Sequence, residues 1–236
     1  MSRRDLRVAA CDGNRALART GLVLGTFGNL SAADRADGVM AIKPSGVAYE
    51  ALTPEQIVIV SLETGGVLEG SLRPSSDTAT HLELYRAFAS AGAVVHTHSE
   101  YATVFAQARE PIRCMGTTHA DYFPGDIPVT RPLTREEVET DYERNTGRVI
   151  VEAFESAGPE PDRVCGVLVA NHGPFTWGAT VQSAIERAEA LELVARLEWR
   201  ARALNPGAPR PAGFLTEKHF RRKHGPAAYY GQRDPR

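Results

Sequence analysis

The segment Ala93–Ser99 (AVVHTHS) places two histidines at the end of an apolar run of β-forming residues. In an extended strand, side chains alternate between the two faces, so His96 and His98 are expected on the same side. Two adjacent imidazoles pack poorly in a core, but they are a good pair of ligands for a divalent metal such as zinc. The segment therefore predicts a strand that ends at a metal centre, with further ligands from elsewhere in the chain.

Apolar runs and helical patterns alternate along the rest of the chain. Strands are expected over residues 39–42, 57–61, 67–68 and 164–170, and helices over residues 3–20, 78–90, 100–108, 134–157 and 182–204. Residues 25–31 are interpreted as a glycine-rich turn, and Leu197 and Trp199 are placed on the apolar side of the last helix. Hairpins combined with strand–helix alternation predict an α/β fold, a mixed sheet with helices on both faces.

The composition excludes several classes of protein. The 236 residues are 42% hydrophobic, which suffices for a sizeable core and favours one large domain over two small ones. A formal net charge of −2 gives no sign of the basic surface that binds nucleic acid. The first residues lack the apolar core of a signal peptide, and no apolar run approaches the ~20 residues of a membrane span. Three distant cysteines in no Cys-x-x-Cys pattern favour a reduced, cytoplasmic setting.

Two further residues are candidates to complete the metal centre. His172 follows the apolar run 164–170 on a glycine turn, which places it at the end of a strand. Asp77 stands among serines at the start of a predicted helix, where it or Ser76 is also expected to cap that helix. Three histidines and one carboxylate with room for a substrate describe a Lewis-acid site. The alternative for each histidine is a structural, hydrogen-bonded role, which the His-x-His pair makes less favoured.

A second group of polar turns is typical of an anion site. Lys43 and Gly46 follow the predicted strand 39–42, and the pairs Gly28-Asn29 and Ser75-Ser76 also lie in turns. Loop amides, hydroxyls and a lysine are the groups that bind a phosphate monoester. Ordinary turn chemistry remains the alternative for the two pairs, whereas a lysine directly after an apolar strand is more suggestive of binding.

Candidates for proton transfer lie in two places. The long segment 111–132 carries His119, Asp121 and Tyr122, and a loop of this length inside a domain is often functional. The basic tail carries Tyr229 and Tyr230, for which packing is the alternative role. Spacing alone selects neither Asp121 nor Tyr230.

These motifs together resemble the class II, metal-dependent sugar-phosphate aldolase family, and within it the L-ribulose-5-phosphate 4-epimerases. The matching stretches are Gly28-Asn-Leu-Ser31, Ile42-Lys-Pro-Ser-Gly46, Pro74-Ser-Ser-Asp-Thr78, Val95-His-Thr-His-Ser99, Gly116-Thr-Thr-His-Ala-Asp-Tyr122, Asn171-His-Gly-Pro-Phe-x-Trp177 and the tail from Lys218 to Gln232. The metal and phosphate motifs are shared with aldolases, whereas the loop around Asp121 and the tail resemble the epimerases.

The resemblance implies one domain over residues 1–236, a three-layer α/β/α sandwich with a largely antiparallel sheet. It implies interconversion of L-ribulose 5-phosphate and D-xylulose 5-phosphate, as in arabinose catabolism, with zinc, or manganese in its place. The implied assembly is a homotetramer in which a tail (about 214–236) completes a neighbour's active site. The implied roles are metal binding for His96, His98, His172 and Asp77; phosphate binding for Asn29, Lys43, Gly46, Ser75 and Ser76; proton transfer for Asp121 and Tyr230; and support for Thr117, Glu143 and His219.

Two departures from the family pattern stand beside the metal motifs. Glu100 and Tyr101 stand where many such epimerases carry basic or imidazole side chains. Ala170-Asn171-His172-Gly173 stands where many of them read His-Ser-His-Gly. The alternatives are an L-fuculose-1-phosphate-type aldolase, which has a glutamate at the position of Asp77, and a sugar-phosphate dehydratase. A non-catalytic scaffold such as the adducin head domain is disfavoured, because all the candidate ligands are present.

Overall fold

The computed structural model describes residues 1–155, 158–224 and 228–231. The strands are β1 (Asn29–Asp34), β2 (Val39–Ile42), β3 (Val58–Ser61), β4 (Val67–Glu69), β5 (Ala93–His96), β6 (Gly166–Leu168) and β7 (Pro174–Gly178). The α-helices are α1 (Arg3–Arg19), α2 (Thr78–Ala87), α3 (Glu100–Ala108), α4 (Thr117–Ala120), α5 (Arg135–Glu152), α6 (Val181–Leu204) and α7 (Gly213–Lys223), with a 3-10 helix η1 (Pro54–Gln56).

The strands form a seven-stranded sheet in the order β4-β3-β2-β1-β5-β7-β6. Every pairing between these strands is antiparallel. The mixed sheet expected from the alternation of elements is therefore wrong, and the antiparallel sheet implied by the resemblance is confirmed. The reason is that β1 to β4 and β6 to β7 form successive hairpins, and β5 enters between them in the opposite direction to both neighbours.

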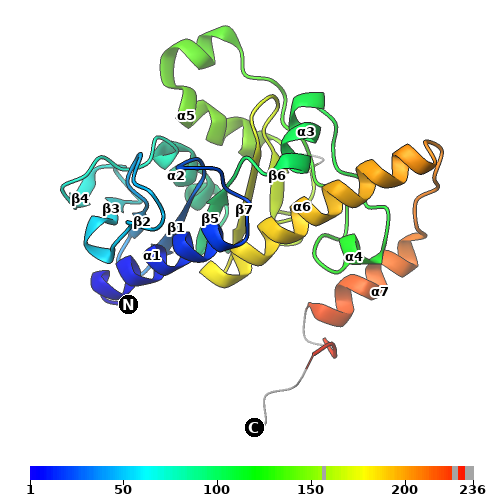
Figure 1. Cartoon of the computed structure of the whole chain (residues 1–236), viewed down its shortest axis with the longest axis horizontal. Helices are drawn as coiled ribbons and strands as arrows, with labels where there is room; N and C mark the ends of the chain where they lie inside the picture. Colours follow the sequence, from blue (N-terminus) through cyan, green and yellow to red (C-terminus); the bar gives the residue numbers. More distant parts are fainter. Residues whose placement is uncertain (156–157, 225–227, 232–236) are drawn as a thin grey trace.

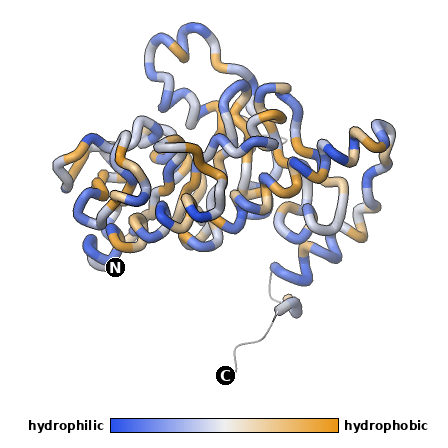
Figure 2. The backbone as a smooth tube through the Cα atoms, viewed as in Figure 1, coloured by the Kyte–Doolittle hydropathy of each residue, from blue (hydrophilic) through white to orange (hydrophobic). Residues whose placement is uncertain are grey.

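Helices cover both faces of the sheet and complete three layers. On β5, Val94 packs into a core with α2 and α5, while its neighbour Val95 packs with α1 and α6 on the other face. This alternation follows from the period of two along a strand. Figure 1 shows α1 and α6 running along one side of the sheet, and Figure 2 shows hydrophilic residues along the protruding part of α5 and along α7.

Some expected elements are confirmed and others are corrected. The helix over 100–108 and the hairpin of β3 and β4 form as predicted. The expected turn over 25–31 is wrong in part, because β1 begins at Asn29. The helix expected to reach residue 157 ends at Glu152. Leu197 and Trp199 are 46% and 48% exposed, so they do not belong to the buried side of α6.

Among the described residues, none of the helices combines the length and the apolar character needed to cross a membrane.

Candidate metal centre

The register of the sheet brings several strand ends to one edge. Asn29 at the start of β1 lies opposite His96 at the end of β5, and His96 lies opposite Phe175 near the start of β7. β2 pairs with β1 and ends one residue before Lys43. His172 stands two residues ahead of β7. Motifs far apart in the sequence therefore meet where these strands end.

His96, His98 and His172 converge, with one ring nitrogen from each lying within 4.8 Å of the others. The Nε2 atoms of His96 and His98 are 3.1 Å apart, and Nδ1 of His96 donates to the Pro174 carbonyl at 3.0 Å. Ligands held at about 2.0–2.1 Å around a tetrahedral ion are about 3.3 Å apart. Nδ1 of His172 is buried without a hydrogen-bond partner among the described residues. The three side chains therefore fit a divalent metal ion.

The environment of His98 and His172 favours the neutral imidazole, which is the form that binds a metal. Burial, reinforced by the neighbouring His96 and His98, lowers the pKa of His172 to about 3. Burial and His96 also lower the pKa of His98. His98 and His172 therefore need not lose a proton at neutral pH before they bind an ion.

Asp77 takes the N-cap position of α2, but its side chain makes no capping hydrogen bond. The expected cap is wrong because the carboxylate is engaged elsewhere: it accepts a 2.6 Å hydrogen bond from the Asn29 amide. Burial raises the pKa of Asp77, but His96, His81 and the Asn29 hydrogen bond together outweigh burial and lower it. Asp77 is therefore an ionised carboxylate beside the histidines. Within the described part of the chain, the group of possible ligand atoms that lie within 4.8 Å of one another contains the three histidines and not Asp77.

A cavity of about 400 Å³ connects the histidines with the anion-binding candidates. The predicted metal and phosphate residues, together with Glu143, all line it: Asn29, Lys43, Gly46, Ser75, Ser76, Asp77, His96, His98, Glu143 and His172. The structure thus brings these residues together, while the role of each one stays a prediction.

Lys43 is the main charged group at the anion-binding end of this cavity. Its side chain is 2% exposed, and burial lowers its pKa. Nζ lies 3.5 Å from the Pro44 carbonyl oxygen and 4.8 Å from the centroid of the Tyr49 ring. Within the described ranges, no carboxylate forms an ion pair with it. Since a buried charge without a counter-ion is costly, this arrangement favours an anionic ligand.

A kink in α5 adds two residues to the cavity. Asp141 has non-helical angles (φ −145°, ψ 70°) inside the helix. The next two residues, Tyr142 and Glu143, line the cavity, and the Tyr142 ring lies 6.3 Å from that of His172. The capping box predicted for Thr134 and Glu137 starts this helix as expected, but the kink that places Tyr142 has no simple sequence signature.

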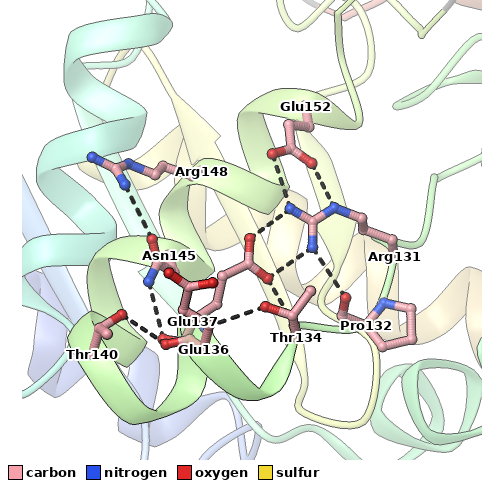
Figure 3. Close-up of polar contacts among 9 residues, drawn as sticks. All are labelled: Arg131, Pro132, Thr134, Glu136, Glu137, Thr140, Asn145, Arg148 and Glu152. Atoms are coloured by element: carbon pink, nitrogen blue, oxygen red, sulfur yellow. Dashed lines mark hydrogen bonds and ion pairs between the residues drawn. The ribbon is translucent and has the colours of Figure 1, made fainter.

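A polar network ties together the two halves of α5 on either side of the kink (Figure 3). The Arg131 guanidinium bonds both carboxylate oxygens of Glu137, at 2.8 and 2.7 Å, and both of Glu152, at 2.8 and 3.0 Å. The Asn145 amide donates to the Glu137 carbonyl oxygen at 3.0 Å. Glu137 precedes the kink while Asn145 and Glu152 follow it, so these contacts hold the bend that carries Tyr142.

The remaining predicted residues gather around α4 and α7, away from the cavity lining. Asp121 accepts hydrogen bonds from Arg222 at 2.6 and 2.9 Å, and it lies 3.1 Å from Nδ1 of His219. The Tyr230 ring lies 4.8 Å from the Arg222 guanidinium. Thr117 lines a separate cavity beside α6. Figure 1 shows α4 beside α7 at the end of the molecule opposite β4.

Sequence reasoning missed three aromatic residues at the site. Phe27 lines the cavity with its ring 5.9 Å from that of His98, and Tyr142 lines it from α5. Tyr49 lies behind it, against Lys43. Each reaches the site through tertiary packing, and the only available signal was the closeness of Phe27 and Tyr49 to glycine-containing polar motifs.

Comparison with known proteins places this architecture in a family. Residues 8–199 match the family described as Class II Aldolase and Adducin N-terminal domain. An L-fuculose 1-phosphate aldolase is 27% identical, with 92% of this chain and 94% of that chain covered and a TM-score of 0.76. YgbL from Klebsiella pneumoniae, whose name offers aldolase, epimerase or decarboxylase without deciding among them, is 26% identical, with 92% of this chain and 99% of that chain covered and a TM-score of 0.72. An L-fuculose-1-phosphate aldolase from Thermus thermophilus is 25% identical, with 87% and 98% covered and a TM-score of 0.66. With its antiparallel sheet, its histidine triad and a match over most of its length, the chain belongs to the class II aldolase and adducin N-terminal domain family.

Proposed function

We propose that the chain is a metal-dependent epimerase that interconverts L-ribulose 5-phosphate and D-xylulose 5-phosphate. One observation carries the proposal: a single cavity is lined by three convergent histidines and by a buried lysine. Such a cavity suits a small sugar phosphate, with sugar oxygens at the histidines and the phosphate at Lys43. Asp77 and the loop around Asp121 favour the epimerase among the sugar-phosphate enzymes that the resemblance implies.

The cavity residues bind and retain the substrate in this proposal. A divalent ion, zinc or manganese, held by His96, His98 and His172 supplies Lewis acidity that stabilises negative charge developing on the sugar oxygens. Lys43 binds the phosphate as a point charge, and the nearby Ser75 adds a hydroxyl group. Because the phosphate stays bound, the aldehyde fragment remains beside its partner after the carbon–carbon bond breaks.

The reaction requires two proton transfers at opposite faces of the aldehyde. A base removes the C4 hydroxyl proton, the C3–C4 bond breaks, and its electron pair stays with the three-carbon fragment. Glycolaldehyde phosphate then rotates, its other face is attacked, the C3–C4 bond re-forms, and a proton returns to the C4 oxygen. We assign these transfers to Asp121 and Tyr230, since a carboxylate and a phenol can act as acid and base.

This assignment requires an oligomer. Among the residues that the structure describes, neither Asp121 nor Tyr230 lines the cavity of its own chain. In this proposal both residues therefore act in the cavity of a neighbouring copy. We therefore propose a homotetramer with active sites shared between subunits. The three cysteines, Cys11, Cys114 and Cys165, are buried and free, which supports a reducing compartment such as the cytoplasm.

An L-fuculose-1-phosphate-type aldolase is the second candidate. Its support is the similarity to two solved structures with that name, at 27% and 25% identity. An aldolase would use the same cavity, but it would release the aldehyde fragment instead of rejoining it.

A product assay separates the two candidates. Zinc-loaded protein is incubated with L-ribulose 5-phosphate, and D-xylulose 5-phosphate and free glycolaldehyde phosphate are both quantified. The epimerase predicts xylulose phosphate without free aldehyde. Accumulating aldehyde would instead assign an aldolase, and neither product from the metal-loaded protein would contradict the pentulose phosphate as substrate.

A further inference from the structure

Tyr49 connects two parts of the anion-binding end of the cavity without lining the cavity itself. The residue is 2% exposed, and its ring faces the Lys43 ammonium at 4.8 Å. Its hydroxyl lies 2.8 Å from the Gly28 carbonyl oxygen and 3.1 Å from that of Phe27. One side chain therefore contacts both the lysine and the loop that leads into Asn29.

The loop that Tyr49 holds has little freedom of its own. Gly28 has a φ of +82°, and a Cβ atom there would come within 2.8 Å of the His96 carbonyl oxygen. Only glycine adopts this conformation at so close an approach. The Gly28 carbonyl group points into the protein and needs a hydrogen-bond donor, which the Tyr49 hydroxyl supplies.

The chemistry of a buried tyrosine suits both contacts. Burial raises the pKa of Tyr49, so the phenol keeps its proton and remains a donor at any physiological pH. Its ring presents the negative face of the π system to the Lys43 ammonium, which stabilises the charge without neutralising it. A carboxylate at this position would occupy the lysine, whereas the ring leaves its charge available to a bound anion.

We propose that Tyr49 is a positioning residue for the phosphate of the substrate. It orients the Lys43 ammonium and fixes the Phe27-Gly28 segment, so that Lys43 and Asn29 approach the same anion. The inference rests on the proposed function in that it takes this end of the cavity as a phosphate site. It adds a residue that touches neither the metal ligands nor the substrate.

The test compares Tyr49→Phe, which removes the hydroxyl and keeps the ring, with Tyr49→Leu, which removes both. Tyr85→Phe is the matched control: Tyr85 is equally buried, its hydroxyl donates to the Ser31 carbonyl oxygen at 3.0 Å, and it does not line the cavity. Binding of inorganic phosphate to the zinc-loaded protein is measured by calorimetry, together with zinc content and melting temperature. This readout requires no assumption about the reaction.

A phosphate affinity about tenfold weaker in Tyr49→Phe is expected, because a hydrogen bond of ordinary strength is lost. Tyr49→Leu is expected to weaken it further through loss of the cation–π contact, and Tyr85→Phe to leave it unchanged. With a sugar phosphate that the enzyme turns over, KM should rise by a similar factor in Tyr49→Phe while kcat stays within about twofold.

Three results would overturn the proposal in distinguishable ways. Equal phosphate affinity in wild-type protein and Tyr49→Phe would exclude the positioning role and leave the anion site intact. If the zinc content or the melting temperature falls together with the phosphate affinity, Tyr49 contributes to the general stability of the fold and not to positioning. No phosphate binding by the wild-type protein would contradict the anion site itself, and with it the role of Tyr49.

Discussion

His96 and His98 direct their Nε2 atoms at each other across 3.1 Å, although His98 lies beyond the last residue of β5. In the neutral tautomers one of these nitrogens can donate to the other, but both can instead offer a lone pair to one metal ion. A shared ion therefore fits this approach, and a ring nitrogen of His172 lies within 4.8 Å of a ring nitrogen of each of the other two histidines.

Replacing both His96 and His98 by alanine is expected to abolish metal binding and activity together, because a single histidine remains. Zinc is counted per chain by elemental analysis after dialysis, and circular dichroism checks the fold. His224→Ala is the matched control for zinc content alone, since His224 contacts the Asp121 carbonyl oxygen instead of the triad. A double variant that keeps one zinc per chain would exclude these residues as the ligands.

Replacing Lys43 by methionine is expected to raise KM by about 10- to 100-fold with a smaller change in kcat. The reason is that a hydrogen bond to a charged group contributes about 1.5–3 kcal/mol. Methionine keeps most of the length of the buried side chain and removes its ammonium group. Steady-state kinetics with a sugar phosphate measure the effect, and an unchanged KM would argue against phosphate binding by Lys43.

The Tyr230→Phe variant is expected to keep its metal and its assembly state while kcat falls by about 10²-fold or more, the usual contribution of a general acid or base. Wild-type turnover in this variant would remove Tyr230 from the chemistry. The tyrosine is 60% exposed in the single chain, so it is accessible to another subunit.

Shared active sites predict complementation between two inactive variants. Tyr230→Phe is mixed with the variant that lacks His96 and His98, after dissociation and reassembly of the subunits. Some cavities then combine an intact metal site with an intact tail, so partial activity is expected to return. If activity does not return although mixed oligomers form, the tail and the cavity do not cooperate between chains.

The sequence predicts the elements whose signals are local, and it fails where pairing decides the structure. β5 and α3 carry strong patterns and form as expected. β1 contains no β-branched residue and is a strand because β2 and β5 pair with it on both sides. α7 has no buried residue, and its residues that contact Asp121 lie 98 or more residues away from it in the sequence. Such pairings leave no periodic signal in one sequence.

The same distinction applies to the candidate site. Polar residues directly after apolar runs mark the ends of strands, so His96, His172 and Lys43 were recognisable from the sequence. The antiparallel register that brings them to one edge is not visible there. Tyr49 and Tyr142 reach the site through a loop contact and a helix kink, so no spacing rule identifies them.

His119 gives a prediction about pH and stability that is independent of the metal. It is 3% exposed, its Nε2 lies 2.9 Å from the Gly125 carbonyl oxygen, and burial lowers its pKa to about 4. The pKa of an unfolded histidine is about 6.5. Between pH 6.5 and 4 the unfolded chain therefore binds a proton that the folded chain does not, and the free energy of unfolding falls as the pH falls.

The shift in pKa corresponds to a loss of up to about 3 kcal/mol from this residue between pH 7 and pH 4. Above pH 6.5 both states are neutral, so the contribution is complete there. His119→Gln keeps an amide donor for the Gly125 carbonyl group but cannot titrate. Urea unfolding of both proteins between pH 4 and 8 is expected to show a steeper loss of stability in wild-type protein. Parallel curves for the two proteins would contradict a buried, neutral His119.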